Sequence, residues 1–304
     1  MIFLVEQYFF VCLNSDCLIC GIHTSYCTNK TDQMEKIISV VLPCFNQGVY
    51  LSEALDSLIG QTYENWEAIV VNDGSSDCTE SVALAYVQRE KRIRYICQEN
   101  KGVSAARNLG VSISVGDYIL PLDPDDRLAP DYMEQCLAVF KQYPDYTLVY
   151  TQTYFFGIKE GIWDLPAYHN YKSFLLGNCI VCTSLFRKED FLRIGGYDEN
   201  MHIGLEDWEL YIRLLHENRK VYQVEAPLFF YRIKGVSRNT ECSKAENIQK
   251  VLRYIYKKHF DTYVDYFGFP LDIIRDLDFY KRKYVLHHNK WYRKIWRRIR
   301  GIGS

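Results

Sequence analysis

Strands and helices alternate along the first part of the chain, and this alternation constrains its fold more than any other feature. Short apolar runs rich in β-branched residues are typical of strands buried on both faces of a sheet. Residues 37–43 are such a run, and further strands are expected over residues 66–71, 93–96 and 117–122. Helical spacing of apolar residues predicts helices through 51–59 and over about 79–89 and 102–114. Such an order requires a parallel sheet with right-handed crossovers, whose ligands bind beyond the carboxyl ends of the strands.

The pattern is looser after residue 150, but it still predicts an α/β fold. A helix is expected over 206–217, because Trp208, Tyr211 and Leu215 share one face. Strands are expected over 183–187, 220–224 and 228–232, and further helical segments around 248–255 and 292–299. The predicted architecture is a mostly parallel sheet flanked by helices, with a helical extension at the C-terminal end.

Composition excludes several classes of protein. The chain has 304 residues, 48% hydrophobic and 24% charged, and a net charge of -2. These values are typical of a globular protein and give no reason to expect a nucleic-acid partner. Eleven cysteines, an odd number in a chain this long, indicate a reducing cytosol rather than a disulfide framework. No uninterrupted apolar run approaches the roughly 18 residues of a membrane-spanning helix.

Charge and pattern suggest three parts. Residues 1–33 are expected to be a poorly ordered extension, 34–240 the main domain, and 241–304 a helical extension with a basic amphipathic tail. The tail holds many basic and no acidic residues: Lys281, Arg282, Lys283, Lys290, Arg293, Lys294, Arg297, Arg298 and Arg300. We expect residues 290–300 to contact an anionic membrane, with packing onto the protein's own body as the alternative.

Two carboxylates follow the fourth predicted strand. Pro124 pushes Asp123 toward an extended backbone, so Asp123 and Asp125 can point to one side. Like charges held this close repel unless a cation compensates, and a hard divalent ion with phosphate as a co-ligand would do so. The alternative is a solvated acidic turn that caps the next helix.

Other segments also carry polar residues at the expected edge of the sheet. Residues 72–77 form turns readily, but a carboxylate there could also accept hydrogen bonds from a base or ribose. Arg107, near the start of a helix, could pair with phosphate or with the nearby acids. Glu206 and Asp207 begin a helix whose dipole stabilises ionised carboxylates, with simple capping as the alternative.

Together these segments resemble the inverting family 2 glycosyltransferases of the GT-A (Rossmann-like) fold, in their bacterial type. The resemblance covers about residues 37–240. It rests on residues 41–46, 71–77, 100–108, 122–126, 195–199 and 206–208, which follow one another in the family's order.

The resemblance implies roles for individual residues. Pro43 and Asp73 would hold the base and ribose of a nucleotide sugar, and Asp123 would contact the ribose side. Asp125 would bind Mn²⁺ or Mg²⁺ through the diphosphate, and Asp207 would deprotonate the acceptor hydroxyl. The other residues expected to bind the nucleotide sugar are Asn46, Asp77, Lys101, Arg107, Glu206, Arg232 and Lys234.

One segment departs from the family pattern. Members often carry Tyr-Arg-x-His near the end of the domain, and its histidine can reach the metal or the phosphates. Here the segment is Tyr231-Arg232-Ile233-Lys234. A protonated lysine cannot ligate a metal ion, but it could pair with phosphate. The resemblance therefore does not extend to a histidine-ligated ion.

The implied activity is transfer of a sugar from a nucleotide diphosphate sugar, with UDP the expected nucleotide, to a hydroxyl of a glycan or lipid-linked glycan. Inversion of the anomeric centre and a role in cell-envelope polysaccharide biosynthesis follow from the same resemblance. The cysteines indicate a place in the cytoplasm, and the basic tail a place at the inner face of the membrane. A sugar nucleotidyltransferase is an alternative, but residues 42–48 lack the basic side chains of a triphosphate loop. A non-catalytic nucleotide-sugar-binding protein is another, disfavoured because Asp125 and Asp207 are both present.

Overall fold

The computed structural model describes residues 36–216, 219–235 and 238–299, and for residues 238–239 and 286–299 it describes the backbone alone. The extension expected over residues 1–33 lies outside this range. The strands are β1 (Ile38–Cys44), β2 (Trp66–Asp73), β3 (Ile93–Gln98), β4 (Tyr118–Pro121), β5 (Arg127–Leu128), β6 (Tyr146–Gly157), β7 (Gly161–Ile162), β8 (Leu185–Arg187) and β9 (Lys220–Ile233). The helices are α1 (Gly48–Ile59), α2 (Thr79–Arg89), α3 (Val103–Ile113), α4 (Tyr132–Gln142), α5 (Tyr171–Phe174), α6 (Lys188–Arg193), α7 (Glu206–Leu214), α8 (Arg238–Cys242), α9 (Ala245–Lys258), α10 (Phe260–Phe267) and α11 (Pro270–Ile299).

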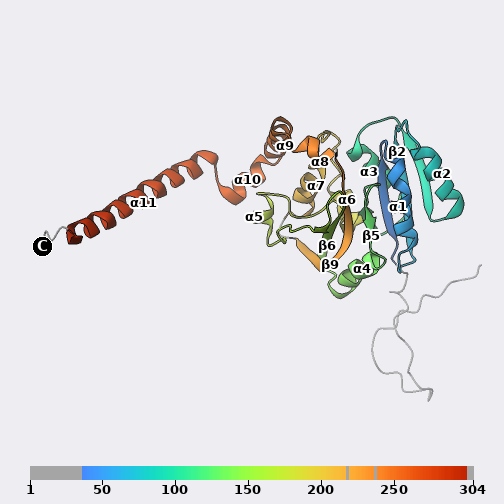
Figure 1. Cartoon of the computed structure of the whole chain (residues 1–304), viewed down its shortest axis with the longest axis horizontal. Coiled ribbons are helices and arrows are strands. Elements are labelled where there is room, and N and C mark those ends of the chain that lie inside the picture. Colours follow the sequence, from blue (N-terminus) through green and yellow to red (C-terminus); the bar gives the residue numbers. More distant parts are fainter. Residues whose placement is uncertain (1–35, 217–218, 236–237, 300–304) are drawn as a thin grey trace, which may run out of the picture. The chain divides into compact units, whose positions relative to one another are not determined.

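The strands form one sheet, and its first half is parallel, which confirms the α/β fold predicted from the sequence (Figure 1). The strand order is β3-β2-β1-β4-β8-β6-β9-β5, with β7 paired to β6. β1 lies between β2 and β4 and runs parallel to both, and β3 runs parallel to β2. The carboxyl ends of these strands therefore meet at one edge of the sheet, where ligands of such folds bind.

From β4 onward the sheet is mixed, which the sequence pattern did not predict. β8 pairs antiparallel to both β4 and β6, whereas β6 and β9 run parallel over almost their whole length. The strands expected over 220–224 and 228–232 are one strand, β9. Its register opposite β6 shifts between Val224 and Pro227. Proline has no backbone N–H to donate to the hydrogen-bond ladder, which accounts for the bulge at this point. The two predicted strands are therefore the halves of one bulged strand.

Helix α3 lies very close to the sheet. A Cβ atom added to Gly110 would come within 2.4 Å of Val41 Cγ1, so glycine is needed for this approach. Ala106 of the same helix is fully buried. The close packing brings Arg107, on α3, to the carboxyl ends of the parallel strands.

A buried charge network attaches α9 and α10 to α7. Glu209 on α7 is fully buried and bonds to Arg213, to Lys258 Nζ at 2.8 Å and to His259 Nε2 at 2.9 Å. Burial acts to raise the pKa of Glu209, but the hydrogen bonds from His259 and Arg213 outweigh it and lower the pKa to about 2. Because Lys258 ends α9 and His259 precedes α10, the network holds both helices against α7. The division expected between residues 240 and 241 stays a prediction.

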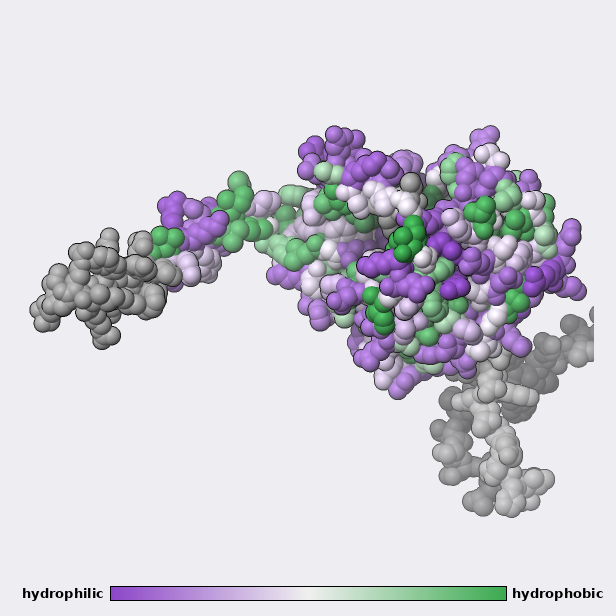
Figure 2. Space-filling model, viewed as in Figure 1, coloured by the Kyte–Doolittle hydropathy of each residue, from purple (hydrophilic) through white to green (hydrophobic). Residues whose placement is uncertain are grey.

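The segment expected to form the amphipathic tail is helical, because α11 runs from Pro270 to Ile299. Large apolar side chains are exposed along its described part, among them Ile274, Leu277 and Tyr284 (Figure 2). The side chains of residues 286–299, on which the predicted membrane contact depends, lie outside the described ones. Within the described part of the chain, every helix is too short or too polar to span a membrane.

Candidate active site

A cavity of about 600 Å³ opens at the carboxyl ends of β1, β2 and β4. Its opposite wall comes from residues between 163 and 182, the start of α7 and the end of β9. Most of the predicted site residues line it: Pro43, Asp73, Arg107, Asp123, Asp125, Glu206, Asp207 and Lys234. The structure therefore brings together residues that are far apart in the sequence, at the edge of the sheet where the strand pattern predicts a ligand.

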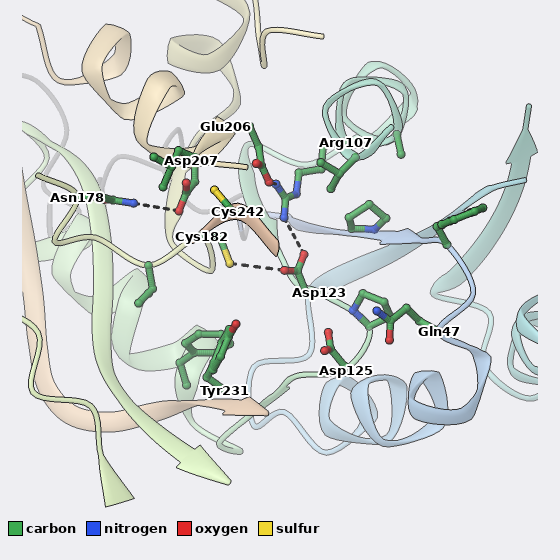
Figure 3. Close-up of a pocket in the computed structure, with 18 of the residues that line it drawn as sticks. Gln47, Arg107, Asp123, Asp125, Asn178, Cys182, Glu206, Asp207, Tyr231 and Cys242 are labelled. Atoms are coloured by element: carbon green, nitrogen blue, oxygen red, sulfur yellow. Dashed lines mark hydrogen bonds and ion pairs between the residues drawn. The ribbon is translucent and has the colours of Figure 1, made fainter. Parts of the chain in front are cut away.

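Arg107 is the buried cation at the centre of the site. Its side chain is 2% exposed, and it donates to Asp123 Oδ1 at 2.7 Å and to Glu206 Oε1 at 2.8 Å (Figure 3). Burial alone would lower the pKa of the guanidinium, but the charges of Asp123 and Glu206 outweigh it and hold the pKa well above its usual value. Of the two partners left open by the sequence, phosphate and nearby acids, the structure pairs Arg107 with the acids. The two ion pairs join α3, the loop after β4 and α7.

Asp73 ends β2 and holds the turn that leads into α3. Its carboxylate accepts hydrogen bonds from Gln98 Nε2 at 2.6 Å and from the backbone nitrogens of Lys101 and Gly102, both at 2.8 Å. Gly102 has a φ of 92°, a left-handed conformation that glycine adopts without a steric penalty. Asp73 thus fixes the entry to α3 while lining the cavity, and its contact with a nucleotide stays a prediction.

Asp207 lies in the first turn of α7 and faces the cavity. Its Oδ2 accepts a hydrogen bond from Asn178 Nδ2 at 3.1 Å, and its Oδ1 accepts one from the backbone nitrogen of Trp208 at 2.7 Å. Burial and then the negative charge of Glu206 raise the pKa of Asp207 to about 6. A carboxylate with a pKa nearer neutrality is better matched to general-base work than an ordinary one.

The loop after β4 is held by the end of β9. Lys234 Nζ lies 2.5 Å from Asp125 Oδ2 and donates to Gln47 Oε1 at 3.1 Å. Arg232 donates from its Nε to the backbone oxygen of Asp125 and from its backbone nitrogen to Asp126 Oδ1, both at 2.8 Å. Figure 3 shows Asp125 and Gln47 on the side of the cavity away from Asp207 and Asn178.

The residues around Asp125 fit a divalent ion that is bound together with substrate phosphates. In the part of the chain that the structure describes, no three His, Cys, Asp or Glu residues are grouped to hold a metal. Asp123 is paired with the buried Arg107, and Asp125 with Lys234. Mg²⁺ in proteins is usually bound by one or two carboxylates together with substrate phosphates and waters. The residues therefore fit an ion that is completed by a diphosphate.

Four predicted nucleotide-binding residues do not line the cavity: Asn46, Asp77, Lys101 and Arg232. Asn46 Oδ1 accepts a hydrogen bond from the backbone nitrogen of Ser76 at 2.8 Å. Asp77 accepts hydrogen bonds from the backbone nitrogens of Gly48 and Thr79, the first residues of α1 and α2, so it caps two helices. Burial would raise the pKa of Asp77, but these hydrogen bonds lower it. Direct contact of the four residues with a ligand stays a prediction.

Sequence reasoning missed the wall opposite the strand ends. The missed residues are Asn178, Cys182, Trp163 and Tyr231, and all four line the cavity. Asn178 bonds to Asp207, and the sulfur of Cys182 lies 3.9 Å from Asp123 Oδ2. The ring centroids of Trp163 and Tyr231 lie 5.6 Å apart. Each lies in an irregular segment or a strand end, and no local spacing links it to its partner.

Two protein families have sequence models that match the chain. The family described as "Glycosyl transferase family 2" matches residues 39–195. The family described as "N-terminal domain of galactosyltransferase" matches residues 168–236. Between them the matches contain nearly all of the residues that line the cavity.

Several curated proteins are similar in sequence. Minor teichoic acid biosynthesis protein GgaB of Bacillus subtilis is 33% identical over 211 residues, which are 64% of this chain and 23% of GgaB. Glycosyltransferase GlyG of Streptococcus pneumoniae is 41% identical over 102 residues, 33% of this chain and 34% of GlyG. The uncharacterized glycosyltransferase RT0329 of Rickettsia typhi is 27% identical over 245 residues, 75% of this chain and 74% of that protein. The matched part thus spans less than a quarter of GgaB and about a third of GlyG.

Solved structures share the fold. The Staphylococcus aureus TarS fragment 1–349 in complex with UDP-GlcNAc superposes with a TM-score of 0.60 at 18% identity, over 72% of this chain and 65% of that one. The mannosyltransferase PcManGT of Pyrobaculum calidifontis, in complex with GDP-Man and Mn²⁺, gives a TM-score of 0.56 at 15% identity, over 74% and 64%.

Replacing Arg107 tests its place at the centre of the site. Arg107→Met removes the guanidinium that pairs with the buried Glu206 and the partly exposed Asp123, so the free energy of unfolding should fall by about 3–5 kcal/mol. Urea unfolding followed by circular dichroism measures it. Arg89→Met, which removes an exposed ion pair to Asp56 at 3.6 Å, is the control and should cost less than about 1 kcal/mol. A similar small loss for both variants would show that the buried pairs do not hold the site together.

Proposed function

The chain belongs to glycosyl transferase family 2, and from this premise we propose that it transfers a sugar from a nucleotide diphosphate sugar to an acceptor hydroxyl, with inversion of the anomeric centre. One observation carries the proposal. A single cavity has the Asp125–Lys234 pair at the strand ends on one side and Asp207, a carboxylate with a raised pKa, on the other. The Asp125–Lys234 pair offers groups that can bind a diphosphate, directly or through a metal ion. Asp207 offers a base for a hydroxyl that must lose a proton.

The donor is proposed to lie against the carboxyl ends of β1, β2 and β4. Pro43 and Asp73 would contact the base and ribose, Asp123 the ribose side, and Asp125 and Lys234 the diphosphate. UDP is the proposed nucleotide, supported by the UDP-GlcNAc complex of TarS, which has the same fold. GDP is the alternative, because PcManGT is in complex with GDP-Man.

The reaction is proposed to be a single displacement. The acceptor oxygen attacks the anomeric carbon from the face opposite the diphosphate, so the bond to phosphate breaks as the new glycosidic bond forms and the centre inverts. Asp207 takes the hydroxyl proton on its carboxylate, while Asn178 keeps that carboxylate oriented. Mn²⁺ or Mg²⁺ held by Asp125 and the diphosphate would supply neutralisation of the charge on the leaving group.

The acceptor is proposed to be a glycan or a lipid-linked glycan. Among the described residues that line the cavity, the basic ones are Arg107, which is paired with Asp123 and Glu206, and Lys234, which is paired with Asp125. The wall opposite the strand ends presents Trp163, Tyr231 and Ile180. Aromatic faces in the cavity suit a neutral sugar ring better than a phosphate. A role in cell-envelope polysaccharide biosynthesis would agree with such an acceptor.

Replacing the base tests the reaction. Asp207→Asn should lower turnover by about 10²–10⁴-fold, while the Kd for UDP with Mn²⁺ stays near wild type, because the side chain acts on the acceptor. Glu206→Gln is the matched control, since it keeps an oxygen for Arg107, and it should cost less. Initial rates with a panel of nucleotide sugars and oligosaccharide acceptors, and calorimetry with UDP, measure the two effects. Near-normal turnover of Asp207→Asn would refute the base, and absence of nucleotide binding in wild type would refute the donor site.

The pH dependence of the rate gives a second test. Asp207 is active as a base only in its deprotonated form. The value of kcat/KM should therefore be at its maximum above the pKa of Asp207 and fall tenfold per pH unit below about 6. Since the charge of Glu206 helps to raise this pKa, Glu206→Gln should move the midpoint to lower pH. A pH–rate profile of both proteins measures the shift. An unchanged midpoint, or one at higher pH, would contradict the assignment.

The C-terminal tail is proposed to hold the enzyme at an anionic membrane surface on the cytoplasmic side. The exposed apolar side chains of α11 and the basic residues 290–300 of the sequence support it. Full-length protein should sediment with phosphatidylglycerol vesicles, less so at high salt, and a 1–280 variant should not. Phosphatidylcholine vesicles are the control. Equal sedimentation of the full-length protein and the 1–280 variant would contradict the proposed membrane contact.

A further inference from the structure

We infer that Lys234 acts as an exchangeable counter-ion: it occupies the cation position at Asp125 until a donor binds, and then moves onto the donor diphosphate. The inference rests on the proposed donor site and goes beyond it, because it assigns the lysine two partners in succession. It also gives a reason for a lysine where the family pattern often has a histidine.

The ammonium of Lys234 lies in a complete cation-binding arrangement. It is 2.5 Å from Asp125 Oδ2 and 3.1 Å from Gln47 Oε1, and it lies over the ring of Tyr50 at 4.8 Å. The side chains of Lys234 and Asp125 are 15% and 16% exposed, so water screens the pair weakly. A second cation can bind Asp125 well only if this ammonium leaves.

The loop that carries Asp125 does not depend on Lys234. Arg232 bonds to the backbone oxygen of Asp125 and to the carboxylate of Asp126, each at 2.8 Å. These contacts would remain if the ammonium moved. A lysine side chain has a flexible four-carbon stem, and Lys234 lines the same cavity as Asp125. The exchange therefore needs a rotation of one side chain and no movement of the backbone.

Charge balance gives the direction of the exchange. Before the donor binds, one ammonium balances one carboxylate. Each phosphate of a nucleotide sugar adds a negative charge beside Asp125. A divalent ion together with the freed ammonium balances Asp125 and both phosphates, whereas Lys234 alone leaves the site strongly negative. Lys234 then donates charge-assisted hydrogen bonds to phosphate oxygens.

The exchange predicts opposite effects of one substitution on two ligands. In Lys234→Met, Mn²⁺ alone should bind about tenfold more tightly than in wild type, because it no longer competes with the ammonium. UDP in the presence of saturating Mn²⁺ should bind about tenfold more weakly, because the phosphates lose a partner. The electron paramagnetic resonance signal of free Mn²⁺ measures the first affinity on full-length protein, and calorimetry measures the second. Lys234→Gln should behave in the same way, which guards against a folding defect in either variant.

Matched variants make the outcome specific. Lys36→Met removes a lysine paired with Asp117 at 3.0 Å at the opposite end of β4, and it should change neither affinity. Adding Asp125→Asn to Lys234→Met should abolish the gain in Mn²⁺ binding. Unchanged or weaker Mn²⁺ binding in both lysine variants, or Mn²⁺-independent UDP binding by wild type, would overturn the exchange while leaving the donor site intact. Failure of wild type to bind UDP under any condition would instead refute the proposed function itself.

Discussion

The buried guanidinium of Arg107 is the interaction on which the rest of the site depends. A cation that is 2% exposed must have anionic partners, and it has one on each side, Asp123 after β4 and Glu206 at the start of α7. Both contacts fail unless α3, β4 and α7 approach one point. Buried ion pairs are weak evidence for net stability, but breaking one is costly. Arg107 therefore fixes where the halves of the cavity meet, and its contact with Glu206 holds the start of α7, which carries Asp207, at that point.

The first half of the fold could be predicted because its signals are local. Residues 79–89 form α2 as expected, and β1 and β2 are buried along their whole length, as their mostly apolar runs indicate. The second half could not be predicted in the same way. β6 shows no regular alternation of buried and exposed residues, and its parallel partner β9 begins more than sixty residues later and is bulged at Pro227. The sequence of neither strand indicates that its partner lies so far along the chain.

The site divides along the same line. Topology placed Asp73, Asp123 and Asp125 at one edge of the sheet, because each follows a parallel strand. Asn46 and Asp77 came from the same reasoning, yet they bond to backbone nitrogens of turns and helix starts. Turn-forming residues and ligand-binding residues are the same amino-acid types at such places, so sequence alone does not separate the roles. The contact between Asn178 and Asp207 joins a loop to the first turn of α7 and has no sequence signal at all.

Charge separation across the cavity follows from how the acids after β4 are compensated. Arg107 pairs with Asp123 and Lys234 with Asp125, while burial and the charges of its neighbours raise the pKa of Asp126 well above its usual value. The Asp125–Lys234 pair therefore lies on the donor side, where a diphosphate brings more negative charge. On the other side the charge of Glu206 acts on Asp207 and raises its pKa. Carboxylates thus require cations at one end of the cavity, a different carboxylate raises the pKa of the base at the other, and Arg107 lies between them, paired with an acid from each side.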